Sequence, residues 1–453
     1  MIFWNRKKTL SHIAEKGDGM QIKCVRDAEK YYDLSSHGFV LNEKRDIKEV
    51  NIYDINTGEK QEDTETVFNF VGFTTNQNDD ILVSFPKHFE YGNINFDMKL
   101  LFNCIMQHRQ RRPELYIGSE DAESYASNYP FASFFKVYDY FEKYGLLYKK
   151  RDYIKPNIGG RLNWKETISR SEKIVLNGNL IFYPFYYQKS TYLSDFVTAC
   201  MNFVIEYTVE KFGVLLDIDS TGVEVPEYDF LGEKAYIVAT LMKLRQETFK
   251  DHENELLESL IDYFSEIKVG GSFYLKHYTF SSIWEDMVND YLCKYYSKVD
   301  SDSKAIIFDK TNQKRVNFEK QKFYTNSAKK KQFISPDHYL SYDGIQLILD
   351  AKYYNKVNSM NYKQIAYMFM LMNMKKENEE EKKFSLTVSS LILPSEVRDT
   401  KIHFKLDSKF GDVEDFIISE EYLEIKEIMK SYVKDNWYSI TKRNKKWLVA
   451  RER

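Results

Sequence analysis

Two aspartates and a lysine in the last third of the chain have residue types and a spacing that could do chemistry. Asp337 precedes a run of aromatic and aliphatic residues, and Asp350 and Lys352 end the next such run. The dipeptide Asp343-Gly344 separates the two runs. An Asp-Gly pair in this setting is among the strongest local signals for a hairpin with a two-residue turn. The sequence therefore predicts that the two runs are neighbouring antiparallel strands.

The predicted turn also fixes which residues face each other. If Tyr342 pairs with Ile345, Asp337 lies directly opposite Asp350. Directly opposed residues have Cβ atoms about 4.5–5.5 Å apart. Lys352 is two residues beyond Asp350 and projects from the same face of its strand. Two carboxylates and an ammonium group are thus expected to share one small volume.

Opposed carboxylates repel each other unless a cation lies between them, and a divalent metal supplies that cation. Mg²⁺ favours one or two carboxylates together with waters and phosphate oxygens. A lysine beside the metal stabilises the charge that develops on a phosphate and helps to hold an attacking water. The chemistry indicated is metal-assisted phosphodiester hydrolysis. The alternative is an exposed hairpin that merely carries surface charge.

A helix predicted over residues 280–295 offers a third carboxylate. Its apolar residues form one stripe, and Glu285 lies at the margin of that stripe, from where it could reach a site beside the core. Asp286 points further outward and is expected on a solvated face. Glu285 is therefore the candidate auxiliary carboxylate.

The segment after the hairpin reads as a helix over 361–374 and then a strand over 384–393. A strand, a helix and a strand in this order predict a right-handed parallel crossover. Gln364 and Tyr367 would then stand near the end of the strand that bears Asp350. Two simpler alternatives stay open, with Gln364 as a surface residue and Tyr367 as a core aromatic.

The stretch before the hairpin is basic. Residues 309–332 contain eight lysines and arginines against two acidic residues, with aromatic residues interleaved. This is the local footprint expected for contact with a nucleic-acid backbone, and the alternative is a solvated loop. A second basic cluster, residues 108–112, could contact phosphate or a partner, or could simply complement the dipole of a helix end.

Composition excludes several classes of protein. The 453 residues are 43% hydrophobic and 29% charged with a net charge of −3, which excludes disorder and a histone-like polyanion binder. No uncharged apolar run reaches the length of a membrane span, and the N-terminus does not resemble a secretory signal, so we expect a cytoplasmic protein. The four cysteines lack CxxC spacing, which argues against a zinc site or a disulfide framework, and we expect them in the core.

The order of predicted elements indicates an α/β chain, α+β overall, in three parts. Residues 1–125 form a mixed, strand-rich N-terminal domain, 126–268 a helical middle region, and 269–453 a domain with a mixed sheet flanked by helices. The pattern also predicts a hairpin formed by residues 67–73 and 81–85. It predicts four helices N-terminal to residue 269, at 96–112, 129–147, 193–212 and 235–264.

Taken together, these residues resemble the PD-(D/E)xK nuclease superfamily, in the branch that includes McrC and the LlaJI-type restriction endonuclease subunits. The matching nuclease motifs are Ile283-Trp284-Glu285, Pro336-Asp337, Asp350-Ala351-Lys352 and Tyr362-Lys363-Gln364-Ile365-Ala366-Tyr367. Weaker matches are Val71-Gly72-Phe73, Phe85-Pro86-Lys87, Asp139-Tyr140-Phe141 with Tyr144-Gly145-Leu146, and Gly160-Arg161-Leu162-Asn163-Trp164. Asp350 stands where many members of the superfamily have Glu, and it can bind a metal on a shorter arm.

The resemblance implies a DNA endonuclease subunit of a restriction system that defends against phage, dependent on Mg²⁺ with Mn²⁺ as a substitute. It implies catalytic and supporting roles as follows: metal ligands Asp337, Asp350 and Glu285; electrostatic residue Lys352; supporting residue Gln364; and contacts with double-stranded DNA from Lys322, Lys329, Lys330, Lys331 and Tyr367. A second reading is a non-catalytic DNA-binding adaptor, and a third is a RecB-like exonuclease.

The resemblance also implies a partner, a hexameric AAA+ GTPase of the McrB kind that the subunit activates. The chain has no GxxxxGK[ST] motif, so the motor would be a separate polypeptide. Residues 1–125 would dock on it, and Arg161 and the 108–112 cluster are further candidates for contact.

Overall fold

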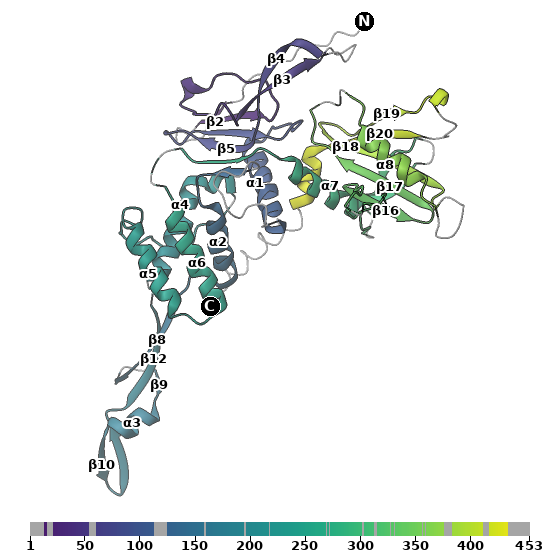
Figure 1. Cartoon of the computed structure of the whole chain (residues 1–453). Coiled ribbons are helices and arrows are strands. Elements are labelled where there is room, and N and C mark those ends of the chain that lie inside the picture. Colours follow the sequence, from purple (N-terminus) through teal and green to yellow (C-terminus); the bar gives the residue numbers. More distant parts are fainter. Residues whose placement is uncertain are drawn as a thin grey trace. The chain divides into compact units, whose positions relative to one another are not determined.

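A computed structural model gives the fold and divides the chain into two compact units, Met1–Asn128 with Gly270–Arg453, and Tyr129–Val269 (Figure 1). The structure describes residues 13–15, 21–53, 60–112, 125–157, 160–193, 196–216, 218–268, 270, 272–300, 303–311, 315–326, 328–329, 331–355, 357, 359–375, 383–410 and 416–433. Among these residues, no helix is long and apolar enough to cross a bilayer.

The first unit contains an N-terminal sheet with the strand order β1-β2-β6-β5-β13-β7. Its strands and the neighbouring elements are β1 (Ile13–Glu15), β2 (Gln21–Arg26), the 3-10 turn Ser35–His37, the ribbon β3 (Ile47–Tyr53) with β4 (Lys60–Phe68), β5 (Val71–Thr75), β6 (Ile81–Phe85), α1 (Ile94–Arg111), β7 (Tyr125–Ser127) and β13 (Tyr274–His277). The hairpin expected from 67–73 and 81–85 is confirmed as β5 and β6. Strand β13 follows the second unit in the sequence but pairs with β5 of this sheet. The sheet is therefore complete only after the chain has passed through the second unit.

Gly72 shows why the Val71-Gly72-Phe73 motif needs its glycine. Gly72 has φ +140°, and a Cβ built there would lie 2.0 Å from the carbonyl oxygen of Leu275 on β13. Any side chain would therefore push β13 away from β5. The motif serves the close packing of two strands.

The second sheet of this unit carries the predicted hairpin, and its strand order is β16-β17-β18-β20-β19. Around it lie α7 (Ser281–Tyr295), β14 (Tyr296–Val299) with β15 (Ile306–Phe308), β16 (His338–Tyr342), β17 (Ile345–Ala351), α8 (Tyr362–Met372), β18 (Leu386–Ser395), β19 (Asp399–Lys405), the 3-10 turn Ser408–Phe410, β20 (Ile417–Glu424) and a helical segment over 425–433. Strands β17, β18 and β20 are parallel, and the edge strands β16 and β19 are antiparallel. The predicted mixed sheet and the β17-α8-β18 crossover are both confirmed.

Helices cover both faces of this sheet. On one face, Tyr339 and Ile348 pack with Tyr367 and Leu371 of α8. Their neighbours His338 and Leu349 point to the opposite face, where His338 contacts Asn289 of α7. The layers are thus helix, sheet and helix, as expected.

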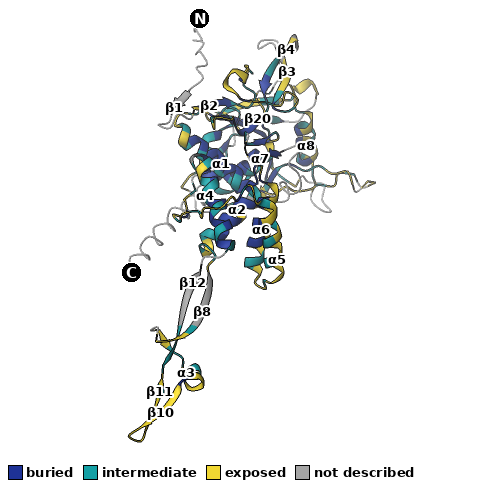
Figure 2. Cartoon of the chain, turned by 90° about the vertical axis from the view of Figure 1, so that its left-hand side faces the viewer, coloured by how far each residue is buried: buried dark blue, intermediate teal, exposed yellow. Residues whose placement is uncertain are grey.

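The second unit is a group of helices from which a stranded arm extends (Figures 1 and 2). The helices are α2 (Phe131–Tyr144), α4 (Phe196–Leu216), α5 (Lys234–Gln246) and α6 (Asp251–Glu266), and the arm holds β8 (Lys149–Pro156), β9 (Arg161–Leu162), α3 (Trp164–Arg170), β10 (Glu172–Leu176), β11 (Asn179–Tyr183) and β12 (Tyr186–Leu193). The single helix expected over 235–264 is two helices, α5 and α6. The strands of the arm were not predicted, since this part was expected to be helical.

Three of the four cysteines lie in the core, where all four were expected. Cys24, Cys104 and Cys200 are buried and Cys293 is half-buried. Burial raises the pKa of the Cys24 thiol to about 12, so it stays protonated at neutral pH. These side chains act as small core residues.

Candidate active site

The hairpin brings Asp337 and Asp350 together. The register runs from Tyr342 opposite Ile345 to His338 opposite Leu349, which confirms the predicted pairing. Asp337 comes immediately before His338, so the same register leads to Asp350, and the charges of the two side chains interact. The turn residues Asp343 and Gly344 have φ of 46° and 78°, the left-handed values that a two-residue hairpin turn requires.

The surroundings move the pKa values of the two carboxyl groups in opposite directions. Burial, followed by the charges of Asp350 and Glu285, raises the pKa of Asp337 to about 7. Burial also acts to raise the pKa of Asp350, but Lys352, the hydrogen bond from Asp337 and Lys363 together bring it below its ordinary value. Asp350 is therefore the more acidic group of the pair, because two carboxylates this close cannot both ionise freely.

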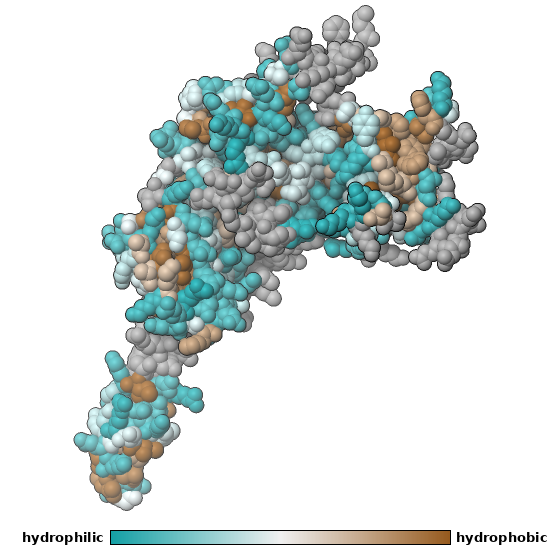
Figure 3. All heavy atoms as spheres, in the orientation of Figure 1, coloured by the Kyte–Doolittle hydropathy of each residue, from teal (hydrophilic) through white to brown (hydrophobic). Residues whose placement is uncertain are grey.

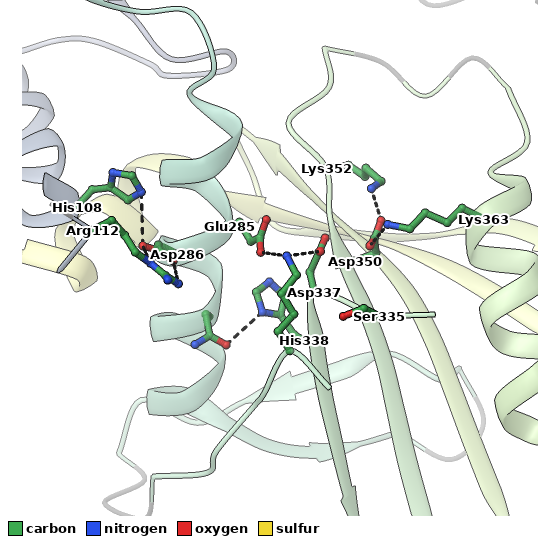
Figure 4. A network of polar contacts seen from close by, with 12 residues as sticks. His108, Arg112, Glu285, Asp286, Ser335, Asp337, His338, Asp350, Lys352 and Lys363 are labelled. Atoms are coloured by element: carbon green, nitrogen blue, oxygen red, sulfur yellow. Dashed lines mark hydrogen bonds and ion pairs between the residues drawn. The ribbon is translucent and has the colours of Figure 1, made fainter. Parts of the chain in front are cut away.

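Two lysines neutralise Asp350, whose side chain is fully buried (Figure 4). Lys352 forms an ion pair with its Oδ2, as expected for residues on one face of a strand. Lys363 of α8 reaches its Oδ1 at 3.2 Å. The sequence motif contained Lys363 but gave it no role, because only the packing of α8 on the sheet brings it to β17.

A third lysine links Glu285 to the pair. The Nζ of Lys320 lies 2.7 Å from Oε1 of Glu285 and 3.3 Å from Oδ1 of Asp337. Burial acts to lower the pKa of Lys320, but Glu285 and Asp337 together raise it. Lys320 was counted only as part of the basic stretch, yet its ammonium group stands between two of the predicted metal ligands, Glu285 and Asp337.

Gln364 and Tyr367 are both buried. The Nε2 of Gln364 donates to the carbonyl oxygen of Ile348 at 2.8 Å and to Oγ of Ser389 at 2.9 Å. It thereby ties α8 to two adjacent strands, so the surface alternative for Gln364 is wrong. Tyr367 is 8% exposed and packs in the cluster under α8, which is the core role that the sequence left open.

His338 was not singled out by the sequence. It is buried, and its Nδ1 lies 3.1 Å from Oδ1 of Asn289. Burial lowers its pKa to about 3, so the imidazole is neutral at physiological pH. Because the imidazole of His338 is neutral, the positive charges of the site come from its lysines.

The donor set fits a divalent metal at the aspartate pair. Asp337 and Asp350 supply two carboxylates at one point, which is the set that Mg²⁺ accepts together with waters and phosphate oxygens. Among the described residues, no three His, Cys, Asp or Glu side chains are grouped closely enough to hold a metal. Glu285, the predicted third ligand, is ion-paired with Lys320.

The basic stretch runs beside the site. Bridges join Glu319 to Tyr339 and Phe323 to Ile334, so part of this stretch lies along the edge strand β16. Lys322 stacks on Phe333 at 4.8 Å, and Lys329 and Lys331 are exposed. Of the predicted DNA contacts, Lys330 lies outside the described residues.

The 108–112 cluster contacts α7. His108 and Arg112 lie 3.5 and 3.3 Å from the carboxylate of Asp286, and Arg111 lies 3.5 Å from Asp290. The expectation that Asp286 sits on a solvated face is wrong, because it is paired with α1 (Figure 4). Arg161, the other candidate for partner contact, is exposed on β9.

Comparisons with known proteins add a family. A family profile described as "LlaJI restriction endonuclease" matches residues 70–418. A solved structure described as "Refined half-complex from tetradecameric assembly of Thermococcus gammatolerans McrB AAA+ hexamers with bound McrC" contains a similar chain, at 11% identity and a TM-score of 0.35, covering 83% of this chain and 84% of that one. That likeness is too low to carry an argument. No curated protein sequence matches.

Proposed function

Since the chain belongs to the LlaJI restriction endonuclease family, and so to a restriction system, we propose that it hydrolyses DNA phosphodiester bonds at Asp337 and Asp350 with Mg²⁺ or Mn²⁺. The observation that carries this proposal is geometric: the hairpin register leads Asp337 to the fully buried Asp350, which is ion-paired with Lys352 and Lys363. Shifted pKa values of neighbouring titratable groups cluster at functional sites, and the two aspartates show such shifts.

Each residue of the site has a task in this reaction. Asp337 and Asp350 would hold the metal, which would polarise the phosphate and activate water. Lys352 stabilises negative charge on the phosphate and orients the water. Lys363 keeps Asp350 ionised, and Gln364 fixes α8, from which Lys363 reaches the site.

DNA is the proposed polyanion because the basic stretch lies along β16, next to Asp337. Lys322, Lys329 and Lys331 are exposed there and available for phosphate contact. Contacts of this kind release counterions, so the affinity for DNA should fall steeply as the salt concentration rises.

We further propose that the motor of the system is a separate AAA+ GTPase, which this chain activates. The proposal rests on the resemblance to McrC and on the absence of a P-loop motif from the sequence. Stimulation of GTP hydrolysis by the purified chain, measured with the NTPase that accompanies it, tests this point.

The deciding experiment is cleavage of supercoiled plasmid by wild type and by Asp350→Asn, with Mg²⁺ and with Mn²⁺, each with and without the NTPase. The matched control is Asp343→Asn, which removes the same charge from the exposed turn of the same hairpin. We expect cleavage by wild type and the control, and a loss of more than about 100-fold in Asp350→Asn. No cleavage by wild type with either metal, alongside stimulated GTP hydrolysis, would overturn the nuclease and favour the adaptor.

A further inference from the structure

Tyr353 is the residue that directly follows Lys352, and its surroundings come from another sheet. It is 8% exposed and packs against Phe280 at a ring distance of 5.3 Å. Its hydroxyl accepts a hydrogen bond of 2.8 Å from the backbone N–H of Lys87 and hydrogen-bonds to the carboxylate of Asp27. Asp27 follows β2 and Lys87 follows β6, two parallel neighbours in the N-terminal sheet.

Lys87 makes two further contacts with Tyr353. Its Nζ donates to the carbonyl oxygen of Tyr353 at 3.2 Å and lies 4.6 Å from the centre of the ring. The same Nζ is 3.8 Å from Oδ2 of Asp27, so the two residues form a partly buried ion pair beneath the tyrosine. The Phe85-Pro86-Lys87 motif of the sequence thus acquires a structural reason.

These contacts fix the backbone around Lys352 from both sides. Its N–H donates to the carbonyl oxygen of Ile392 on β18 at 2.9 Å, and the residue after it is held by Asp27 and Lys87. Lys352 is the first residue after β17, which ends at Ala351, so apart from that bond the strand ladder does not control its direction. The ammonium group of Lys352 can form its ion pair with Asp350 only if the backbone just after β17 keeps its position.

We propose that Lys87 and Asp27 are positioning residues of the nuclease site, which act through Tyr353 to hold Lys352 beside Asp350. The N-terminal sheet is then a working part of the catalytic site and not only a docking domain. This inference rests on the proposed function, because it assigns to Lys352 the role given above.

A matched control comes from the same two sheets. Arg26 of β2 pairs with Glu396, which follows β18, at 3.4 Å, and the two side chains are 30% and 52% exposed. This pair also joins the N-terminal sheet to the sheet of strands β16 to β20, which we call the nuclease sheet, but through residues other than Asp27, Lys87 and Tyr353. Breaking it tests whether any link between the sheets matters, or only the link through Tyr353.

The experiment compares Lys87→Met, Lys87→Arg, Tyr353→Phe and Glu396→Gln in plasmid cleavage, in Mn²⁺ binding measured by electron paramagnetic resonance, and in thermal unfolding. Because a displacement of 1 Å can cost about 100-fold in rate, we expect kcat to fall about 10- to 100-fold in Lys87→Met and Tyr353→Phe. The KM for DNA and the Mn²⁺ affinity should stay near wild type. Lys87→Arg should recover part of kcat, and Glu396→Gln should change it less than about twofold.

Three outcomes would overturn the inference. The first is an unchanged kcat in both Lys87→Met and Tyr353→Phe. The second is a loss of kcat in Glu396→Gln as large as the loss in those two variants. The third is a loss of kcat that parallels a lower unfolding temperature and a weaker Mn²⁺ affinity in the same variants. If wild type cuts and Asp350→Asn does not, such a result rejects the positioning role alone. If Asp350→Asn also cuts, the proposed function itself has failed.

Discussion

The nuclease sheet and the β10–β11 hairpin depart in opposite ways from the usual pattern, in which charged side chains are exposed and apolar side chains are buried. In the sheet, Asp350 and Glu421 are fully buried charges. In the hairpin, apolar side chains face solvent, with exposed fractions of 72% at Val175, 57% at Leu176 and 59% at Tyr183. Figure 3 shows hydrophobic residues gathered at this end of the arm.

This difference between buried charges and exposed apolar side chains indicates what a substitution in each region should affect. A buried charge is costly unless it is paired, and Asp350 has two lysines while Glu421 has Arg398. An apolar hairpin of two strands is marginal by itself, and most apolar side chains of this one are exposed in the described structure. Changes in the sheet should therefore alter chemistry, whereas changes in the hairpin should leave both chemistry and folding intact.

The largest effect should come from Lys352→Ala. Without the ammonium group the phosphate loses its charge partner, and cleavage should fall by about 100- to 1000-fold while DNA binding stays nearly intact. Single-turnover cleavage and a filter-binding assay separate the two quantities. Lys401→Ala, on an exposed edge of the same sheet, is the control. Cleavage by Lys352→Ala at the wild-type rate would refute the assignment.

A second test uses the raised pKa of Asp337. Its pKa of about 7 lies above the ordinary value of about 4, so the folded protein binds more protons than the unfolded chain between these pH values. The stability that this group contributes is therefore lost progressively as pH rises from about 4 to about 7. Without added metal, Asp337→Asn should unfold at a higher temperature than wild type at pH 8, and show a clearly smaller difference at pH 5. The variant should also fail to cut DNA. A gain of equal size at both pH values would contradict the raised pKa of Asp337.

A smaller effect is expected from Lys320→Ala. Its ammonium group occupies the space between Glu285 and Asp337 and competes with any other cation there. Because the lysine is half exposed, its removal should lower the Mn²⁺ concentration for half-saturation by only about two- to fivefold. Titration of Mn²⁺ measured by electron paramagnetic resonance checks this, with Lys322→Ala as the neighbouring control. Weaker Mn²⁺ binding in Lys320→Ala would show that the lysine supports the site instead.

The smallest effect should come from the hairpin. Replacing Ile174, Val175 and Ile181 with serine should change the free energy of unfolding by less than about 0.5 kcal/mol each, because these side chains are exposed. The matched change in the nuclease sheet, Leu347→Ala, should cost about 2–5 kcal/mol because Leu347 is fully buried. Denaturant unfolding measures both. A large loss in the serine variant would mean that the hairpin carries part of the fold.

Local signals were sufficient for much of the nuclease sheet. The pair Asp343-Gly344 determines its own turn, and the two-residue period of a strand then fixes that Asp337 meets Asp350. The arm was missed for the opposite reason. Both faces of β10 are exposed, so its sequence lacks the alternation that identifies a half-buried strand.

The sequence by itself determined the hairpin, its register, the crossover through α8 and the face shared by Asp350 and Lys352, because each depends on residues close together in the chain. Only the tertiary structure decided that Lys320 separates Glu285 from Asp337, that Lys363 reaches Asp350, and that Lys87 holds Tyr353. Lys87 and Tyr353 are 266 residues apart, and no local periodicity records such a contact. Pairings of this kind arise from the packing of whole elements, which brings together side chains whose spacing in the sequence carries no signal.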